Sequence, residues 1–122
     1  MPKEQKPKVL VVEDNPPVQE AIRVLLEDDF CVLTASTGSE ALIILRQDKE
    51  IRVVTTSTLR GQVINGFVLA RKIRNDYHWA KVILVTGAGD VKMPAGIAEC
   101  FCAVVHKPFL FPLVAKIHFL LI

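Results

Sequence analysis

Five residues that could handle a phosphoryl group each follow, or end, a short apolar segment of the chain. Glu13 and Asp14 form an adjacent acidic pair, Thr58 and Thr86 carry hydroxyls, and Lys107 carries an ammonium group. Two neighbouring carboxylates suit a hard divalent cation such as Mg²⁺, which prefers oxygen ligands. A hydroxyl and an ammonium group can hydrogen-bond to phosphoryl oxygens. The set therefore indicates a site of phosphoryl chemistry.

Short apolar runs predict five strands that carry these candidates, at residues 9–12, 31–35, 51–57, 82–86 and 104–106. Apolar residues recur at helical spacing at about 17–27, 39–47, 67–75 and 111–122. Parallel strands need crossovers, so this alternation predicts an α/β fold: a single doubly wound five-stranded parallel sheet with helices on both faces. In such sheets ligands bind outside the carboxyl ends of the strands, where the candidates lie.

The connection between the fourth and fifth predicted strands is the weakest helical segment. Residues 93–102 contain Pro94, which a helix tolerates only in its first turn. They also contain Gly96, which costs about 1 kcal/mol relative to Ala in a helix interior. A short or irregular helix is expected there.

Length and charge limit the other possibilities. A chain of 122 residues has room for one domain that folds without disulfides or a structural metal. Residues 1–7 are polar and rich in Lys and Pro, so a flexible tail is expected there and the domain at residues 8–122. The net charge is only +2 and is not gathered into a patch, which argues against nucleic-acid binding.

The hydrophobic residues and the cysteines favour a cytoplasmic protein without a membrane anchor. The most apolar stretch, residues 108–122, is interrupted by Lys116 and His118 and is shorter than the ~18–20 residues that a membrane span requires. Three cysteines make an odd count, and Cys100 and Cys102 are too close for the usual zinc-ligand spacing. A reducing, cytoplasmic compartment is therefore expected.

Five segments, taken together, resemble the receiver domain of two-component response regulators (CheY-like). They are residues 9–16 (VLVVEDNP), 37–42 (TGSEAL), 65–74 (NGFVLARKIR), 82–86 (VILVT) and 107–109 (KPF). The resemblance covers about residues 8–121, with the segments in the family's order and at its intervals. It implies a flavodoxin-like sheet of strand order 2-1-3-4-5 and a signalling role without enzymatic activity. It also implies a sensor histidine kinase or another two-component protein as partner.

The resemblance implies that the family's phosphoacceptor Asp is missing at Thr58. The family's phosphoacceptor is an Asp at the end of the third strand, eight residues before the Gly of an Asp/Asn-Gly pair. Counting back from Gly66 gives Thr58, and the interval from Asp14 agrees. Residues 55–58 contain no carboxylate, so the absence does not depend on register. A Thr hydroxyl is unionised at neutral pH, so it cannot take a phosphoryl group from phosphohistidine in the family's manner.

Losing that Asp also removes one ligand of the family's Mg²⁺. Glu13 and Asp14 are therefore expected to form a weak or vestigial Mg²⁺ site, with Lys107 paired to them even when no ligand is bound. No other cofactor is expected.

Further positions carry over from the family, some of them altered. Thr86 and Lys107 match its switch and phosphate-contact positions, and Pro108 matches its cis-proline. Val104 stands where the family has a switch aromatic, and Gly61-Gln62 where it has Met-Pro. The resemblance thus implies that the switch around Thr58 has changed as well.

The last predicted helix carries a second apolar stripe. Ala115, Phe119 and Ile122 form this second stripe, since other residues already complete the stripe that faces the core. Val114 lies beside the second stripe. Receivers often dimerise through their fourth helix, fifth strand and fifth helix, so a homodimer through this face is expected. End-of-chain packing is the alternative explanation.

These features predict a stand-alone, atypical (pseudo-)receiver in two-component signalling, with no separate output domain. It is not phosphorylated at the usual position and acts by protein–protein binding and dimerisation. Two alternatives stay open. One is phosphorylation of Thr58 or a neighbouring hydroxyl. The other is an engineered Asp-to-Thr variant of an active phosphorelay regulator, although one substitution does not explain Gly61, Gln62 and Val104.

Overall fold

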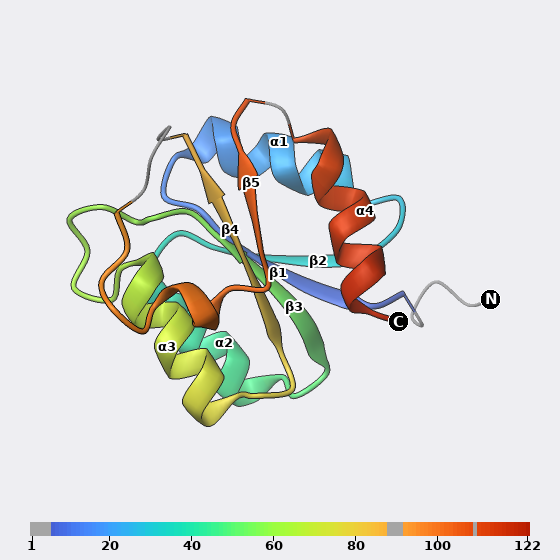
Figure 1. Ribbon diagram of the computed structural model, residues 1–122. Helices are drawn as coiled ribbons and strands as arrows, with labels where there is room; N and C mark the ends of the chain where they lie inside the picture. The colour runs from blue at the N-terminus through green and yellow to red at the C-terminus, as the bar shows by residue number, and fades with distance from the viewer. Residues whose placement is uncertain (1–5, 88–91, 109) are drawn as a thin grey trace.

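The computed structural model describes residues 6–87, 92–108 and 110–122. Its strands are β1 (Lys8–Val12), β2 (Cys31–Ala35), β3 (Ile51–Thr56), β4 (Lys81–Thr86) and β5 (Ala103–His106). They form one sheet of order β2-β1-β3-β4-β5, in which every neighbouring pair is parallel (Figure 1). The predicted fold class and strand order are confirmed.

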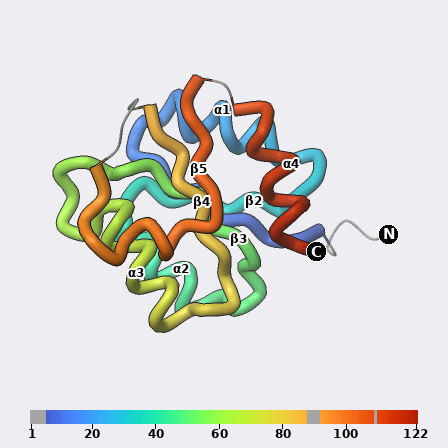
Figure 2. The backbone as a smooth tube through the Cα atoms, in the orientation of Figure 1, coloured from blue at the N-terminus to red at the C-terminus, as the bar shows by residue number. Residues whose placement is uncertain are grey.

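Helices cover both faces of this sheet, as predicted. They are α1 (Pro16–Leu26), α2 (Gly38–Gln47), α3 (Gly66–Asp76) and α4 (Phe111–Leu120), with one 3₁₀ turn, η2 (Ala98–Cys100). The tube in Figure 2 shows α1 and α4 together on one side, and α2 and α3 on the other. The label α4 belongs to the last helix, because the described part of the crossover from β4 to β5 contains only η2.

Polar residues directly after the strands begin the helices. Asn15 Oδ1 accepts a hydrogen bond from Val18 N at 3.2 Å, and Thr37 Oγ1 accepts one from Glu40 N at 3.0 Å. Asn65 Oδ1 accepts from the backbone N–H groups of the first turn of α3. Such caps satisfy N–H groups that have no partner within the helix. Local sequence thus decides where each strand–helix connection turns, and hence where the site lies.

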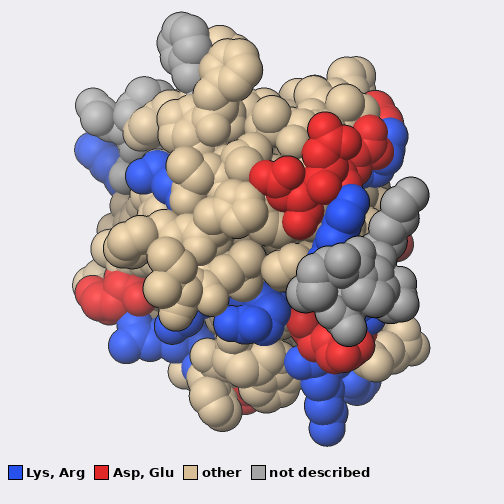
Figure 3. Space-filling model, turned by 90° about the vertical axis from the view of Figure 1, so that its right-hand side faces the viewer, with Lys and Arg blue, Asp and Glu red and all other residues tan. Residues whose placement is uncertain are grey.

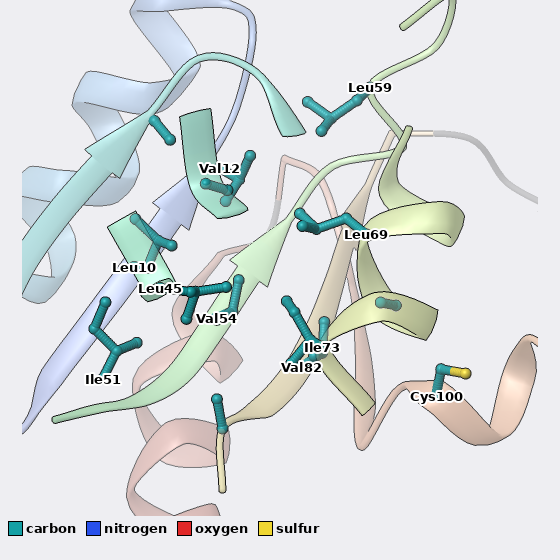
Figure 4. Close-up of a cluster of buried hydrophobic side chains, with 14 residues drawn as sticks. Leu10, Val12, Leu45, Ile51, Val54, Leu59, Leu69, Ile73, Val82 and Cys100 are labelled. Atoms are coloured by element: carbon teal, nitrogen blue, oxygen red, sulfur yellow. The ribbon is translucent and has the colours of Figure 1, made fainter. Parts of the chain in front are cut away.

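Two apolar layers hold the helices on the sheet. On one face, Leu45 of α2 and Leu69 and Ile73 of α3 pack on Leu10 and Val54 of the sheet (Figure 4). On the other face, the buried residues are Val9, Val11, Ile22, Leu26, Phe30, Val53, Ile83, Val85, Val105, Leu113 and Ile117. Inner strands are buried on both faces, which explains their continuous apolar runs.

The crossover between β4 and β5 has lost most of its helix in the described residues. Gly96 adopts a φ of +82°, in the left-handed region that an α-helix cannot continue through. Pro94 O accepts the N–H of Ile97 at 3.1 Å, and only η2 follows. The prediction of a short or irregular helix at residues 93–102 is confirmed.

Residues 1–5 of the predicted tail lie outside the described residues. Pro7 is tied to the sheet, since its carbonyl accepts a hydrogen bond from Cys31 N at 2.9 Å. The backbone of Pro7 thus already takes part in hydrogen bonding to β2. None of the helices in the described ranges has the length and hydrophobicity that a membrane crossing requires.

Candidate functional site

The predicted site residues lie at the carboxyl ends of the central strands. Glu13 directly follows β1, Thr58 lies two residues after β3, Thr86 ends β4 and Lys107 directly follows β5. Because all five strands run parallel, these ends meet at one edge of the sheet.

A partly buried ion pair joins the carboxyl ends of β1 and β5. Lys107 Nζ lies 2.7 Å from Glu13 Oε1, with side-chain exposures of 23% and 2% respectively. The second carboxylate oxygen of Glu13 accepts a hydrogen bond from Asn15 N at 3.1 Å. Asp14, next in the chain, is exposed. The predicted pairing of Lys107 with the acidic pair is therefore present with Glu13, and both oxygens of that carboxylate are occupied by protein donors.

The hydroxyl-rich end of β3 is mostly inaccessible. Thr55, Thr56 and Ser57 are 1%, 1% and 6% exposed, whereas Thr58 is half-buried. Thr56 Oγ1 donates to Ser57 O at 2.8 Å, and Ser57 Oγ is buried with no hydrogen-bond partner in the described part of the chain. Thr58 is thus the most accessible hydroxyl of this run.

Close backbone contacts set the position of Thr58. Gly66 N donates to Thr58 O at 2.8 Å, which closes the loop from β3 to α3. A Cβ atom on Gly66 would lie 2.2 Å from Ser57 O, so only glycine fits between α3 and the strand end. Within the loop, Leu59 has a φ of 51° and Gly61 a φ of 88°. The loop shape therefore depends on backbone contacts that the residue type at position 58 does not alter.

Gln62 holds this loop to the neighbouring one. Its Oε1 accepts from Gly38 N at 3.0 Å, and its Nε2 donates to Ser36 O at 3.2 Å. Gln19 Nε2 makes a similar bridge, donating to Glu13 O at 2.9 Å and to Ala35 O at 3.1 Å. Sequence reasoning noted Gln62 only as a lost proline and did not single out Gln19. The spacing of hydrophobic residues along the chain cannot indicate either bridge, because both bridges join residues from separate loops.

The predicted switch positions Thr86 and Val104 lie on the neighbouring strands β4 and β5. Thr86 is 2% exposed, and its carbonyl accepts the backbone N–H of Lys107 at 2.8 Å. The Lys107–Pro108 peptide bond is cis. Val104 in β5 pairs with Leu84 and is 36% exposed, so the position of the predicted switch aromatic carries a small, outward side chain.

The predicted dimer residues on α4 are mostly exposed. Phe119 is 75% exposed, Ile122 is fully exposed and Ala115 is exposed, while Val114 is half-buried against the core. A shallow cavity of about 290 Å³ beside them is lined by Cys102, Ala103, Ala115, Lys116, Phe119 and Leu120. The side of the molecule that carries α4 shows a broad area without charged groups, with acidic and basic side chains around it (Figure 3).

Comparison with known families decides the class of this fold and site. The Response regulator receiver domain model matches residues 9–115. The chain belongs to this family. Receiver domains are signalling domains of two-component systems and in general are not enzymes, so the coarse prediction of family and role is confirmed.

Two curated two-component proteins are similar to this chain over most of its length. The chain is 32% identical over 95 residues to the probable C4-dicarboxylate response regulator DctR of Halalkalibacterium halodurans, covering 75% of this chain and 40% of the relative. It is 29% identical over 107 residues to the sensor histidine kinase TmoS of Ectopseudomonas mendocina, covering 85% of this chain and 11% of the relative. The chain therefore spans less than half the length of these curated relatives.

Solved receiver structures share the fold. The response regulator TrrA of Thermotoga maritima, in complex with Mg²⁺–BeF, has 27% identity and a TM-score of 0.81, covering 93% of this chain and 97% of that one. A receiver domain from Clostridium thermocellum has 30% identity and a TM-score of 0.81, covering 93% and 92%.

The two adjacent carboxylates at this receiver edge differ in how accessible they are to a cation. Both oxygens of Glu13 already have protein donors, which leaves Asp14 as the accessible carboxylate of the pair. In the described ranges no three His, Cys, Asp or Glu side chains gather as a metal centre needs. Mg²⁺ prefers an octahedral shell and keeps several waters when few protein ligands are available.

Proposed function

We propose that this receiver domain signals by protein–protein binding and is not phosphorylated at the position that its family uses. The observation that carries the proposal is the strand end at residues 55–58, which contains three buried hydroxyls, half-buried Thr58 and no carboxylate. A nucleophilic hydroxyl needs a neighbouring general base. No described His, Asp or Glu side chain hydrogen-bonds to the hydroxyl of Thr58.

The Lys107–Glu13 pair supports a fixed conformation of the edge. In this proposal the ammonium group binds the buried Glu13 carboxylate in place of phosphoryl oxygens, so no ligand is needed to position it. Mg²⁺ binding through Asp14 is weak in consequence. A Mg²⁺ titration that saturates at micromolar concentration would contradict this part of the proposal.

Phosphotransfer can be tested directly. The purified protein is incubated with Mg²⁺ and acetyl phosphate, and its intact mass is measured over time. We expect no mass gain, and a receiver with the family's acceptor Asp, treated in parallel, shows that the reagent is active. A stable gain of one phosphoryl group on this chain would overturn the proposal.

Phosphorylation of Thr58 by a serine/threonine kinase is the second candidate function. Its support is exposure: Thr58 is the one hydroxyl of residues 55–58 that is not fully buried. Phosphopeptide mapping of protein isolated from its own cells distinguishes the two candidates. Phosphate at Thr58, absent from a T58A variant, would favour the second candidate over the first.

The proposed partners are a sensor histidine kinase, or another two-component protein, and a second copy of this chain, in the cytoplasm. The homodimer face consists of Val114, Ala115, Phe119 and Ile122, on α4 and at its end. A contiguous apolar patch of this kind is typical of interaction surfaces. In the described part of the crossover, η2 is the one helical turn where the family's dimer face has its fourth helix, so we assign the face to α4 and the start of β5 that borders it.

The oligomeric state follows from light scattering coupled to size exclusion. We expect a dimer at micromolar concentration, which the F119D variant converts to a monomer. The V24D variant places the same charge at an exposed apolar residue of α1 and is the matched control. A monomeric wild-type protein, or equal effects of the two variants, would rule out this face.

A further inference from the structure

A groove runs between α3 and the irregular crossover that follows β4. Its volume is about 510 Å³, and its lining includes Phe67, Val68, Arg71, Lys72, Pro94 and Ile97. Figure 2 shows the segment that leads into η2 passing beside α3. This groove lies along α3, on the opposite side of the sheet from α4, and one end of it reaches Asn65 in the β3–α3 loop (Figure 1).

The groove follows the axis of α3. Phe67, Arg71 and Asn75 all line it and recur every four residues, so they share one face of the helix. Eight residues of helix extend about 12 Å. The groove is therefore long enough for about two turns of another helix lying along α3.

The described part of the crossover contains no α-helix that would cover this face of α3. A parallel connection is usually made by a helix that packs on the sheet and its neighbours. Here Gly96, with φ +82°, turns the chain so closely that an added Cβ atom would lie 3.4 Å from Arg71 Nη2. The crossover in its described part borders the groove without filling it.

Charge and polarity differ between the floor and the rim of the groove. Ile97 is 5% exposed and Phe67 and Val68 are half-buried, which makes an apolar floor. Arg71 and Lys72 are exposed at the rim, and neither forms an ion pair with any described residue. An occupant that matches both features is apolar on one side and acidic beside it.

We propose that this groove binds a short acidic amphipathic helix of a partner protein. Helix-in-groove recognition places apolar side chains at helical spacing into such a floor, while rim charges select the partner. The partner helix takes the volume that a longer crossover helix would fill, with its carboxylates facing Arg71 and Lys72. This binding does not depend on whether Thr58 is phosphorylated.

A second copy of this chain does not supply such a helix. In α1, Glu20 pairs with Arg23, and in α2 the carboxylate of Glu40 accepts from Ser36 N. The helix α4 contains no acidic residue, and α3 has only its last residue, Asp76. None of these four helices presents a row of accessible acids.

Selection from a phage-displayed library of random helical peptides tests the proposal with the whole chain as bait. We expect enriched peptides with acidic residues beside an apolar stripe. Their binding by fluorescence polarisation should weaken at least about tenfold in the R71E/K72E variant. The R46E/K49E variant changes the net charge equally at two other exposed cations and should bind as the wild type does.

Other results of the same experiment overturn the proposal. These are no enrichment over an empty surface, enriched peptides without excess acid, and equal binding to the two charge-reversed variants. Amide chemical shifts give an independent readout: peptide-induced changes must centre on α3 and residues 92–97. Changes centred on α4 would overturn the assignment, as would dissociation of a homodimer by R71E/K72E.

Discussion

The two sides of the receiver edge are held by different kinds of interaction. On the β1–β5 side, Glu13 and Lys107 form one partly buried ion pair between residues 94 positions apart. On the β3 side, Gly66 and Gln62 hold the loop through close backbone packing and amide hydrogen bonds. The first side depends on two particular charges, whereas the second depends on shape. Thr58, the residue that we propose stands at the family's acceptor position, lies on the second side, where the fold does not depend on its side chain.

The largest loss of stability is expected when the close backbone packing on the β3 side is disrupted. In G66A the new methyl group would lie 2.2 Å from Ser57 O, so either α3 or the strand end must move. We expect a loss of about 4 kcal/mol in the free energy of unfolding, measured by urea denaturation. G87A is the control, because its Cβ atom would meet only Lys107 Cδ at 3.8 Å, an ordinary contact. Equal stability of the two variants would contradict the shape argument.

The next largest effect is expected from breaking the ion pair. K107A leaves the buried Glu13 carboxylate without its cation, which is expected to cost about 2–3 kcal/mol, less than the loss of a fully buried partner because the Lys107 side chain is 23% exposed. Urea denaturation measures this loss, with K116A as the control at an exposed lysine of α4. The double variant E13L/K107M should regain most of the loss, since apolar residues of similar size often replace a buried pair at little cost. A double variant as unstable as K107A would show that the charges themselves are required.

A smaller effect is expected from the amide bridge. Q62A removes two hydrogen bonds between the β3–α3 loop and the β2–α2 connection, each of which contributes about 1 kcal/mol. The variant should unfold about 1–2 kcal/mol more easily, and hydrogen exchange at Gly38 N should accelerate. Q47A, at an exposed glutamine that ends α2, should leave both measurements unchanged. Unaltered exchange in Q62A would mean that the bridge is not formed in solution.

The smallest effect on stability is expected at Thr58 itself. Its hydrogen bond to Gly66 uses the backbone carbonyl, so T58A should stay within about 0.5 kcal/mol of the wild type. Differential scanning calorimetry can resolve the comparison between T58A and Q62A. A T58A variant less stable than Q62A would show that the Thr side chain supports the loop, and the contrast between the two sides would then fail.

Much of the fold could be predicted because its signals are local. The apolar runs of the inner strands, and capping residues such as Thr37 and Asn65, depend on residues a few positions apart. Predicted strand and helix limits agree with the structure to within one or two residues at most ends, for example 104–106 against Ala103–His106. The irregular crossover was also predictable, because Gly96 weakens a helix wherever it occurs.

The residues that make up the site could be predicted from the sequence, but which of them contact one another could be predicted only in part. Residues that follow parallel strands reach one edge, so Glu13, Thr58, Thr86 and Lys107 were identifiable from order and spacing. Which carboxylate the ammonium group of Lys107 contacts was not, because that choice depends on the side chains' relative depths. The bridges of Gln19 and Gln62 join residues that only folding brings together.

The sequence by itself determined the parallel α/β fold, the edge at which its polar residues gather, and the absence of a carboxylate at residues 55–58. These are properties of composition and spacing along the chain. The tertiary structure alone decided that Glu13 is the buried partner of Lys107, that Thr58 is the most accessible hydroxyl of its run, and that an open groove lies along α3. Burial and contact distance are properties of segments packed against one another, so hydrophobic spacing within one segment cannot encode them.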